Sequence, residues 1–291
     1  MKLLLTGVTG FIGKKIAEKL LISGHEVHAL VRNVPGNSFL TVGRIHYHVI
    51  SESSVKDIIY AVKPDVVMHI ASKFLAEHSY EDIDDLITSN VTFPALLLDA
   101  MSMAGVRNFI NTGTSWQHYN SNSYNPVNFY AATKQAFEDI IKFYTETKKI
   151  KCITLKIYDS YGPDDTRGKL ISLLDRLALS QEPLAMSKGE QKISFVHVDD
   201  ICRAFEIAID KILLAPLGHN VNYGLPGCEC VSLRELVSIY EECNRCKLNI
   251  VWGERNYRER EVMLPAENLV TLPGWEPTIS LSVGLDRSSR I

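Results

Sequence analysis

Two residues four positions apart carry the clearest catalytic chemistry in this chain. Tyr130 and Lys134 occur in Tyr-Ala-Ala-Thr-Lys, and on a helix this spacing places both side chains on one face. A tyrosine hydroxyl has a pKa near 10, and a neighbouring ammonium lowers it by favouring the phenolate. Such a tyrosine gives a proton to a carbonyl oxygen as a hydride arrives, or removes it in reverse. The pair predicts a hydride-transfer enzyme; the alternative is a surface pair on an amphipathic helix.

A glycine-rich turn at the start of the chain is the second pattern with chemical meaning. A short apolar run, residues 2–5, leads into Thr-Gly-Val-Thr-Gly-Phe-Ile-Gly, and an amphipathic stretch follows. The glycines permit a tight turn, a close approach of backbone N–H groups to a pyrophosphate, and close packing of helix on strand. This order predicts a dinucleotide site made by Gly7, Thr9, Gly10, Phe11, Ile12 and Gly13. The alternative is an ordinary glycine-rich turn between a strand and a helix.

The remaining elements are those of a fold that can position these two motifs. Apolar runs at 25–31, 45–50, 66–70, 106–111 and 153–158 alternate with helical patterns at 55–62, 83–104 and 128–148. The pattern at 83–104 is interrupted near Pro94. This alternation predicts an α/β fold, a Rossmann-type doubly wound parallel sheet. After residue 163 the alternation stops. We expect a dinucleotide-binding domain at 1–160 plus 193–223, and a smaller interleaved C-terminal substrate-binding subdomain at 161–192 plus 224–291.

Composition excludes several other classes of function. The chain has 291 residues, 46% of them apolar and 22% charged, with a net charge of −3. These values are ordinary for a globular protein and indicate neither a nucleic-acid partner nor an anionic membrane surface. No apolar run reaches transmembrane length, and the first residues lead directly into a strand, so we expect a cytoplasmic protein.

Six cysteines raise the question of a metal site. Cys228 and Cys230, with Cys243 and Cys246, supply four thiols. Cys-x-Cys paired with Cys-x-x-Cys is not a typical zinc-ribbon spacing, so we expect unrelated thiols and no metal, with zinc as the alternative. Disulfides are not expected in a reducing compartment.

Several motifs together resemble one family. The spacing Gly-x-x-Gly-x-x-Gly resembles the short-chain dehydrogenase/reductase superfamily, in particular its extended branch, the NAD-dependent epimerase/dehydratase family. The resemblance covers nearly the whole chain, because the segments 65–71, 161–163, 195–200 and 274–277 also match this branch. It implies an enzyme that acts on a nucleotide sugar.

The resemblance also implies roles for individual residues. Thr114 takes the position of the catalytic hydroxyl beside Tyr130, with Thr112 and Ser115 as alternatives, and Lys134 also binds the nicotinamide ribose. Further cofactor contacts are implied at Ala71 and Asn90, and substrate contacts at Thr114, Trp116, Asp159 and Arg258. A solvated charged helix face is the alternative for Arg258. Pairing of the helices at 83–104 and 128–148 across a two-fold axis implies a homodimer.

Departures from the family pattern bear on the cofactor. Arg32 stands at the end of the second strand, nineteen residues after Gly13, where an acidic residue would bind the adenosine ribose and exclude a 2′-phosphate. An arginine there presents a planar fork to that phosphate. We therefore expect NADP(H), with NAD(H) possible and a solvent-facing arginine as the alternative. Ser51 or Glu52 replaces the family's adenine-facing aspartate.

The residues after Thr114 bear on the reaction. Dehydratases of this branch carry two carboxylates there, whereas this chain continues with Ser-Trp-Gln, which disfavours elimination of water. We expect NADPH-dependent reduction of the 4-keto group of a nucleotide-linked deoxysugar, possibly CDP-linked, as the resemblance to the CDP-abequose synthase group implies. Alternatives are a nucleotide-sugar epimerase with tightly bound NAD and a non-catalytic NADP-sensing regulator.

Overall fold

A single parallel sheet organises the larger part of the chain. The computed structural model describes residues 1–36, 43, 45–51, 53–121, 123–180, 182–267 and 269–287; Glu52 lies outside them. Seven strands lie in the order β10-β6-β5-β4-β1-β2-β3, all parallel. Their bounds are β1 Lys2–Thr6, β2 Glu26–Val31, β3 Ile45–Val49, β4 Val66–His69, β5 Asn108–Thr114, β6 Lys151–Ile157 and β10 Asn220–Leu225. The predicted fold class is confirmed.

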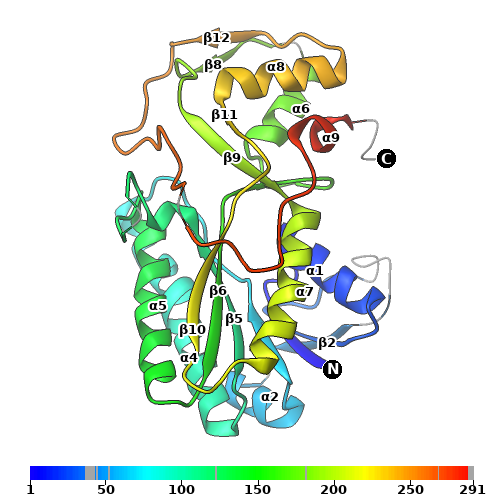
Figure 1. Ribbon diagram of the computed structural model, residues 1–291, viewed down its shortest axis with the longest axis vertical. Helices are drawn as coiled ribbons and strands as arrows, with labels where there is room; N and C mark the ends of the chain where they lie inside the picture. The colour runs from blue at the N-terminus through cyan, green and yellow to red at the C-terminus, as the bar shows by residue number, and fades with distance from the viewer. Residues whose placement is uncertain are drawn as a thin grey trace.

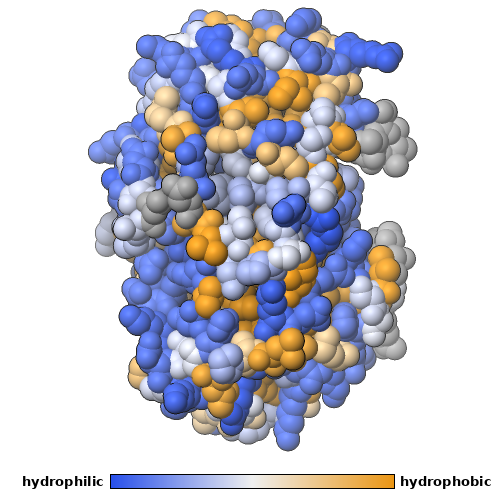
Figure 2. All heavy atoms as spheres, in the orientation of Figure 1, coloured by the Kyte–Doolittle hydropathy of each residue, from blue (hydrophilic) through white to orange (hydrophobic). Residues whose placement is uncertain are grey.

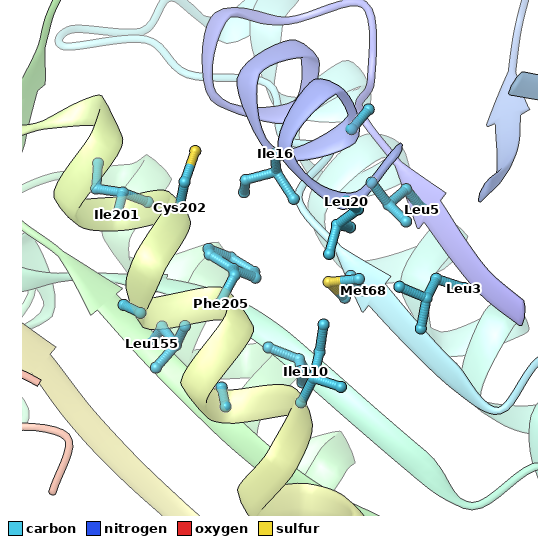
Figure 3. Packing of buried hydrophobic residues seen from close by; sticks show 14 of the residues in the cluster. Leu3, Leu5, Ile16, Leu20, Met68, Ile110, Leu155, Ile201, Cys202 and Phe205 are labelled. Carbon is cyan, nitrogen blue, oxygen red and sulfur yellow. The ribbon is translucent and has the colours of Figure 1, made fainter. Parts of the chain in front are cut away.

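Helices cover both faces of this sheet (Figure 1). One face carries α1 (Phe11–Ile22) and α7 (Val198–Leu214), and the other carries α2 (Val55–Val62), α4 (Phe93–Ala104) and α5 (Phe129–Glu146). On the first face Leu20 and Phe205 point towards strand residues such as Met68 and Ile110 (Figure 3). Each such buried side chain contributes about 1.5–3 kcal/mol through removal from water. The strand order reverses at β1 and β4, and parallel sheets bind ligands at such a point.

The predicted helix at 83–104 is interrupted near Pro94, as expected, and is divided into several turns. A 3₁₀ turn η1 (Tyr80–Asp82) and α3 (Ile83–Ile87) lead into a π turn η2 (Thr88–Thr92), and α4 begins just before Pro94. Proline has no N–H to donate to the preceding turn, which accounts for the irregularity at this point. The stretch Tyr80–Ala104 is also long and apolar enough to cross a membrane by length and composition alone. Core helices pass the same test, and this one packs on α2 and α5.

The remaining elements form a smaller lobe, at the top of Figure 1. One sheet contains β7 (Asp159–Tyr161), β9 (Lys192–His197) and β11 (Cys230–Ser232), and a second pairs β8 (Leu184–Met186) with β12 (Ile250–Trp252). Helices α6 (Leu170–Ser180), α8 (Leu233–Asn244) and α9 (Leu281–Leu285) pack on them around a separate apolar core. On the face shown in Figure 2, both lobes are largely hydrophilic, with apolar side chains in separate groups.

The boundary between the lobes differs from the predicted one. Residues 193–197 were expected in the dinucleotide-binding domain, but β9 pairs with β7 and β11 in the smaller lobe. The C-terminal chain also returns to the large core, where Trp275 is buried and donates its indole N–H to the carbonyl of Asp200 at 2.8 Å. Hydrogen bonds between segments that are distant in the sequence therefore place β9 in the smaller lobe and Trp275 against the larger one.

The four cysteines considered for zinc do not form a ligand cluster. Cys228 and Cys230 flank the start of β11, whereas Cys243 lies in α8 and Cys246 just beyond it. Cys243 donates its thiol hydrogen to the carbonyl of Ser282 at 3.3 Å. Within the described ranges, no three His, Cys, Asp or Glu side chains are grouped to hold a metal ion.

Candidate active site

A cavity of about 1490 Å³ lies at the carboxyl ends of the large sheet, bounded by both lobes. This volume exceeds that of a typical single-ligand pocket, so it can hold two ligands side by side. All but one of the predicted site residues line this cavity. They are Gly7, Thr9, Gly10, Phe11, Ile12, Gly13, Arg32, Ala71, Thr114, Trp116, Tyr130, Lys134, Asp159 and Arg258.

The glycine turn is shaped for a bound pyrophosphate. Gly7 has φ +78°, and a Cβ there would lie 2.5 Å from the backbone nitrogen of Ala71; a Cβ on Gly13 would lie 2.1 Å from the Gly7 carbonyl oxygen. Only glycine satisfies both positions. The turn ends at Gly10, the N-cap of α1, and the first N–H groups of a helix have no partner within it. Residues 10–13 therefore fit a dinucleotide pyrophosphate.

A hydroxyl behind the turn holds it against the neighbouring strand. Thr6 Oγ1 accepts hydrogen bonds from the backbone N–H groups of Ile70 and Ala71, each at 3.1 Å. The same hydroxyl is 2.9 Å from Nδ1 of the buried His69. These contacts explain why Ala71, two residues beyond the end of β4, lies beside the predicted cofactor site.

Arg32 lies at the other end of the predicted cofactor site. It follows the last residue of β2, is exposed, and lines the cavity. Among the described side chains, no carboxylate forms an ion pair with Arg32. Its guanidinium can therefore bind an anionic group on the adenosine ribose of a dinucleotide.

Tyr130 and Lys134 lie in the first turns of α5, as predicted from their spacing. Asn128 caps this helix by accepting from the N–H of Ala131 at 2.9 Å, and its amide donates to the carbonyl of Ala76 at 2.9 Å. The helix start is thereby attached to the segment that follows β4. Both side chains consequently face the same cavity as the glycine turn.

The electrostatics of Tyr130 differ from the expectation. Burial raises the pKa of Tyr130 to about 12, opposed by a hydrogen bond with Ser72. We expected a neighbouring ammonium to lower this pKa, but desolvation of the phenolate dominates. Tyr130 is therefore protonated at neutral pH. A protonated phenol is ready to donate to a substrate oxygen.

Lys134 is almost completely buried. Burial lowers the pKa of Lys134 to about 8, and the nearby carboxylate of Glu138 opposes this effect. At neutral pH the ammonium form still predominates. Burial of this ammonium is a cost to the fold, which hydrogen bonds to a cofactor ribose would offset in part.

Lys134→Met should therefore stabilise the free protein while impairing the site. The pKa of Lys134 falls from 10.5 unfolded to about 8 folded, so its ammonium destabilises the fold below pH 8 by about 3 kcal/mol. This cost disappears as the pH rises from 8 to 10.5. Thermal melts at pH 7 should show a higher Tm for the variant, and the difference should shrink by pH 10. Fluorescence titration should show weaker NADPH binding; unchanged affinity would remove the proposed ribose contact.

Asn90 lies in a different place from the one predicted. It is buried in the π turn η2 and does not line the cavity. Its Oδ1 accepts from the N–H of Lys73 at 2.8 Å, and its Nδ2 donates to Thr133 Oγ1 at 3.0 Å. Because protein partners occupy its amide, Asn90 holds the segment after β4 against α5. It supports the cofactor site from behind.

Three hydroxyl residues remain candidates for the position beside Tyr130. Thr112, Thr114 and Ser115 all line the cavity. Thr114 caps the 3₁₀ turn η3 (Ser115–Gln117), and its Oγ1 accepts from the N–H of Trp116 at 3.3 Å. Thr112 Oγ1 is buried without a hydrogen-bond partner in the described part of the chain.

Alanine substitution should separate these candidates. Thr114→Ala should lower turnover about 10²-fold because it removes a hydrogen bond to the reacting oxygen, while Thr114→Ser retains most activity. We expect much smaller losses in Thr112→Ala and Ser115→Ala. Steady-state rates of the four variants at saturating cofactor provide the comparison. A larger loss in Thr112→Ala than in Thr114→Ala would transfer the role to Thr112.

The structure adds an aromatic residue that the sequence analysis missed. The Phe74 ring lies edge-on to Tyr130, with centroids 5.0 Å apart, and 5.5 Å from the Trp116 ring. Lys169 Nζ lies 4.9 Å from the Phe74 ring centre. Phe74 lies five residues after the end of β4, and Lys169 ends the polar loop before α6. In the sequence, only the nearness of Phe74 to the segment 65–71, and of Lys169 to the segment 161–163, could have indicated that these residues lie at the site.

The smaller lobe contributes the charged side of the cavity. Burial raises the pKa of the Asp159 carboxyl, and Lys169, Arg167 and Arg258 oppose that rise through their positive charge. Arg258 also lies within ion-pair distance of Glu77, with 3.5 Å between Nε and Oε1. Asp159 and Arg258 are thus brought together with cations that the sequence pattern did not indicate.

Together the sheet, the glycine turn and the Tyr130–Lys134 pair define a dinucleotide-dependent α/β enzyme. Residues 3–224 match the NAD dependent epimerase/dehydratase family. The chain belongs to this family, which confirms the resemblance, and it is an NAD(P)-dependent enzyme.

Individual relatives are similar over nearly their full lengths. A CDP-abequose synthase from Yersinia pseudotuberculosis is 27% identical, covering 91% of this chain and 92% of the relative. A UDP-glucose 4-epimerase from Mycolicibacterium smegmatis is also 27% identical, covering 99% and 97%. Among solved structures, UDP-glucose 4-epimerase from Thermotoga maritima has a TM-score of 0.83 at 22% identity, covering 99% and 97%. The structure of MoeE5 in complex with UDP-glucuronic acid and NAD has a TM-score of 0.82 at 21% identity, and the match covers 98% of this chain and 96% of MoeE5.

Proposed function

We propose that the protein uses NADPH to reduce the 4-keto group of a nucleotide-linked deoxysugar in the cytoplasm. The observation that carries this proposal is one cavity that contains a dinucleotide turn, an arginine at the ribose end and a protonated tyrosine. The similarity to CDP-abequose synthases supports a CDP-linked sugar.

The charge of the cavity suits two anionic ligands. Of the described residues that line it, nine are lysines or arginines and three are carboxylates. This excess of positive charge would balance the negative phosphates of both a dinucleotide and a nucleotide sugar. Arg258 and Lys169 lie on the substrate side and would meet the sugar diphosphate, in exchange for the present contacts with Glu77 and Phe74.

The chain's own residues perform the proton part of the reaction. Bound NADPH would supply the hydride. Tyr130 donates its phenolic proton to the C4 oxygen as negative charge develops there, and Thr114 donates a hydrogen bond to the same oxygen. The Lys134 ammonium then stabilises the phenolate that remains. Because the pKa of Tyr130 lies far above neutral pH, its phenol begins protonated and can act as the acid in the reductive direction.

A panel of nucleotide sugars tests the proposal. Wild-type protein should oxidise NADPH in proportion to added CDP-linked 4-keto-6-deoxysugar, and mass spectrometry should show a product two hydrogen atoms heavier. The same assay with UDP- and dTDP-linked ketosugars determines which nucleotide base the protein prefers. Stoichiometric NADPH consumption distinguishes reduction from epimerisation, which consumes no net cofactor. Absence of NADPH oxidation with every ketosugar would reject the reductase.

The similarity to a UDP-glucose 4-epimerase favours a second candidate, an epimerase that retains NAD. Acid denaturation of the purified protein, followed by analysis of the released nucleotide, separates the two. One NAD per chain and conversion of a UDP-hexose without added cofactor would establish the epimerase.

A homodimer is expected from the exposed faces of α4 and α5. Leu96 and Met103, seven residues apart on α4, are 59% and 52% exposed, and Phe143 on α5 is 58% exposed. Two such helix pairs would bury these side chains against each other. Sedimentation at micromolar concentration should show a dimer, and Leu96→Glu should convert it to a monomer. A monomeric wild type would contradict this expectation.

A further inference from the structure

A buried ion pair lies directly behind the proposed catalytic residues. Glu138 follows Lys134 by one turn of α5, and Lys156 lies on β6; Glu138 Oε2 is 3.3 Å from Lys156 Nζ, and both side chains are buried. Glu138 Oε1 accepts from Gln117 Nε2 at 2.8 Å, and Oε2 accepts from Asn222 Nδ2 at 2.9 Å. The carboxylate therefore joins α5 to β6, β10 and η3.

Both partners of this pair reach the turn that follows Thr114. Gln117 Oε1 accepts from the Thr114 backbone N–H at 3.0 Å, so one side chain links Thr114 to Glu138. Lys156 Nζ donates to His118 Nε2 at 2.9 Å, and His118 Nδ1 lies 3.1 Å from the carbonyl of Ser123. The carbonyl can only accept, so Nδ1 carries the proton and Nε2 accepts from Lys156.

Gly113 provides the space for this arrangement. A Cβ at this position of β5 would lie 2.9 Å from Lys156 Cγ and 3.0 Å from Gln117 Oε1. The missing side chain lets both groups pass beneath the strand that ends in Thr114. Lys156 on β6 and Gln117 on η3 therefore both meet Glu138 on α5, one helical turn after Lys134.

We propose that Glu138 and Lys156 are positioning residues for the reaction of Tyr130, Lys134 and Thr114. Burying two charges costs as much desolvation energy as their attraction returns, so the pair is poorly explained by stability alone. Its geometry fixes the Thr114 turn against α5, and a misplacement of about 1 Å at such a site costs about 10²-fold in rate. Glu138 also acts on the charge of Lys134, because its carboxylate raises the pKa of Lys134, and the Lys134 charge in turn lowers the pKa of His69 on β4.

Glu138→Gln tests the role while preserving the size of the side chain. All partners of Glu138 are donors, so the amide NH2 must face a donor in either orientation, Gln117 Nε2 on one side or Lys156 and Asn222 on the other. We therefore expect kcat to fall about 10²-fold with smaller changes in KM. Loss of the carboxylate lowers the pKa of Lys134, because its charge favours the ammonium. The basic limb of the kcat–pH profile should move to lower pH. Glu146→Gln, on an exposed turn of the same helix, is the matched control and should change neither quantity.

A double variant separates positioning from stability. Glu138→Gln with Lys156→Met removes both charges, and we expect the Tm to recover towards the wild-type value while kcat stays low and the pH limb stays displaced. Wild-type kcat and pH profile in the folded single or double variant would overturn the inference. The inference rests on the proposed Tyr130–Lys134 chemistry but not on the sugar, so reductive or epimerising turnover serves equally. A wild type inactive on every substrate would instead count against the proposed function.

Discussion

Tyr130→Phe should lower turnover by about 10²–10⁴-fold, the range for loss of a general acid. The ring remains, so its packing against Phe74, with centroids 5.0 Å apart, is retained. The phenolic proton that must reach the C4 oxygen is lost. NADPH affinity should change little, because the glycine turn and Lys134 do not depend on this hydroxyl.

Rapid-quench and steady-state rates, with fluorescence titration of NADPH, give the two quantities. Tyr144→Phe is the matched control: it lies on the same helix and donates to Asp99 Oδ1 at 2.9 Å, away from the cavity. The control should retain full turnover. If Tyr130→Phe turned over at the wild-type rate, the proton donor would have to be another group in the cavity.

Arg32→Asp should invert the cofactor preference from NADPH to NADH. A bidentate arginine–phosphate contact at a partly exposed site is worth about 1.5–3 kcal/mol, or roughly ten- to a hundredfold in affinity. Only NADPH carries the 2′-phosphate that Arg32 can bind in this way. The new carboxylate also repels that phosphate and accepts a hydrogen bond from a ribose hydroxyl.

Turnover at saturating cofactor should change little, because Arg32 lies beyond the end of β2 and Tyr130 lies on α5. The Kd values of both cofactors, measured for both proteins, check the inversion. Arg176→Asp makes the same charge change on an exposed residue outside the cavity and should leave the preference intact. Equal wild-type affinity for the two cofactors would make Arg32 a bystander and strengthen the epimerase alternative.

Local patterns in the sequence determined the parallel sheet and most of the site. Gly7, Gly10 and Gly13 are close in the chain and must form one turn, and Tyr130 and Lys134 share a helix face wherever that helix lies. Apolar runs such as Val66–His69 predicted buried strands because a parallel strand is covered on both faces. These inferences need only the geometry of one element and its neighbour.

Tertiary structure decided what depends on burial and on distant segments. The pKa of Tyr130 rises because surrounding chain excludes water from it, which no spacing to Lys134 reveals. Asn90 supports the cofactor site because its amide is used by Lys73 and Thr133. Glu138 meets Lys156 only because α5 lies across β6. The sequence predicts which groups react, whereas the packing of separate elements sets the pKa values of these groups and positions them.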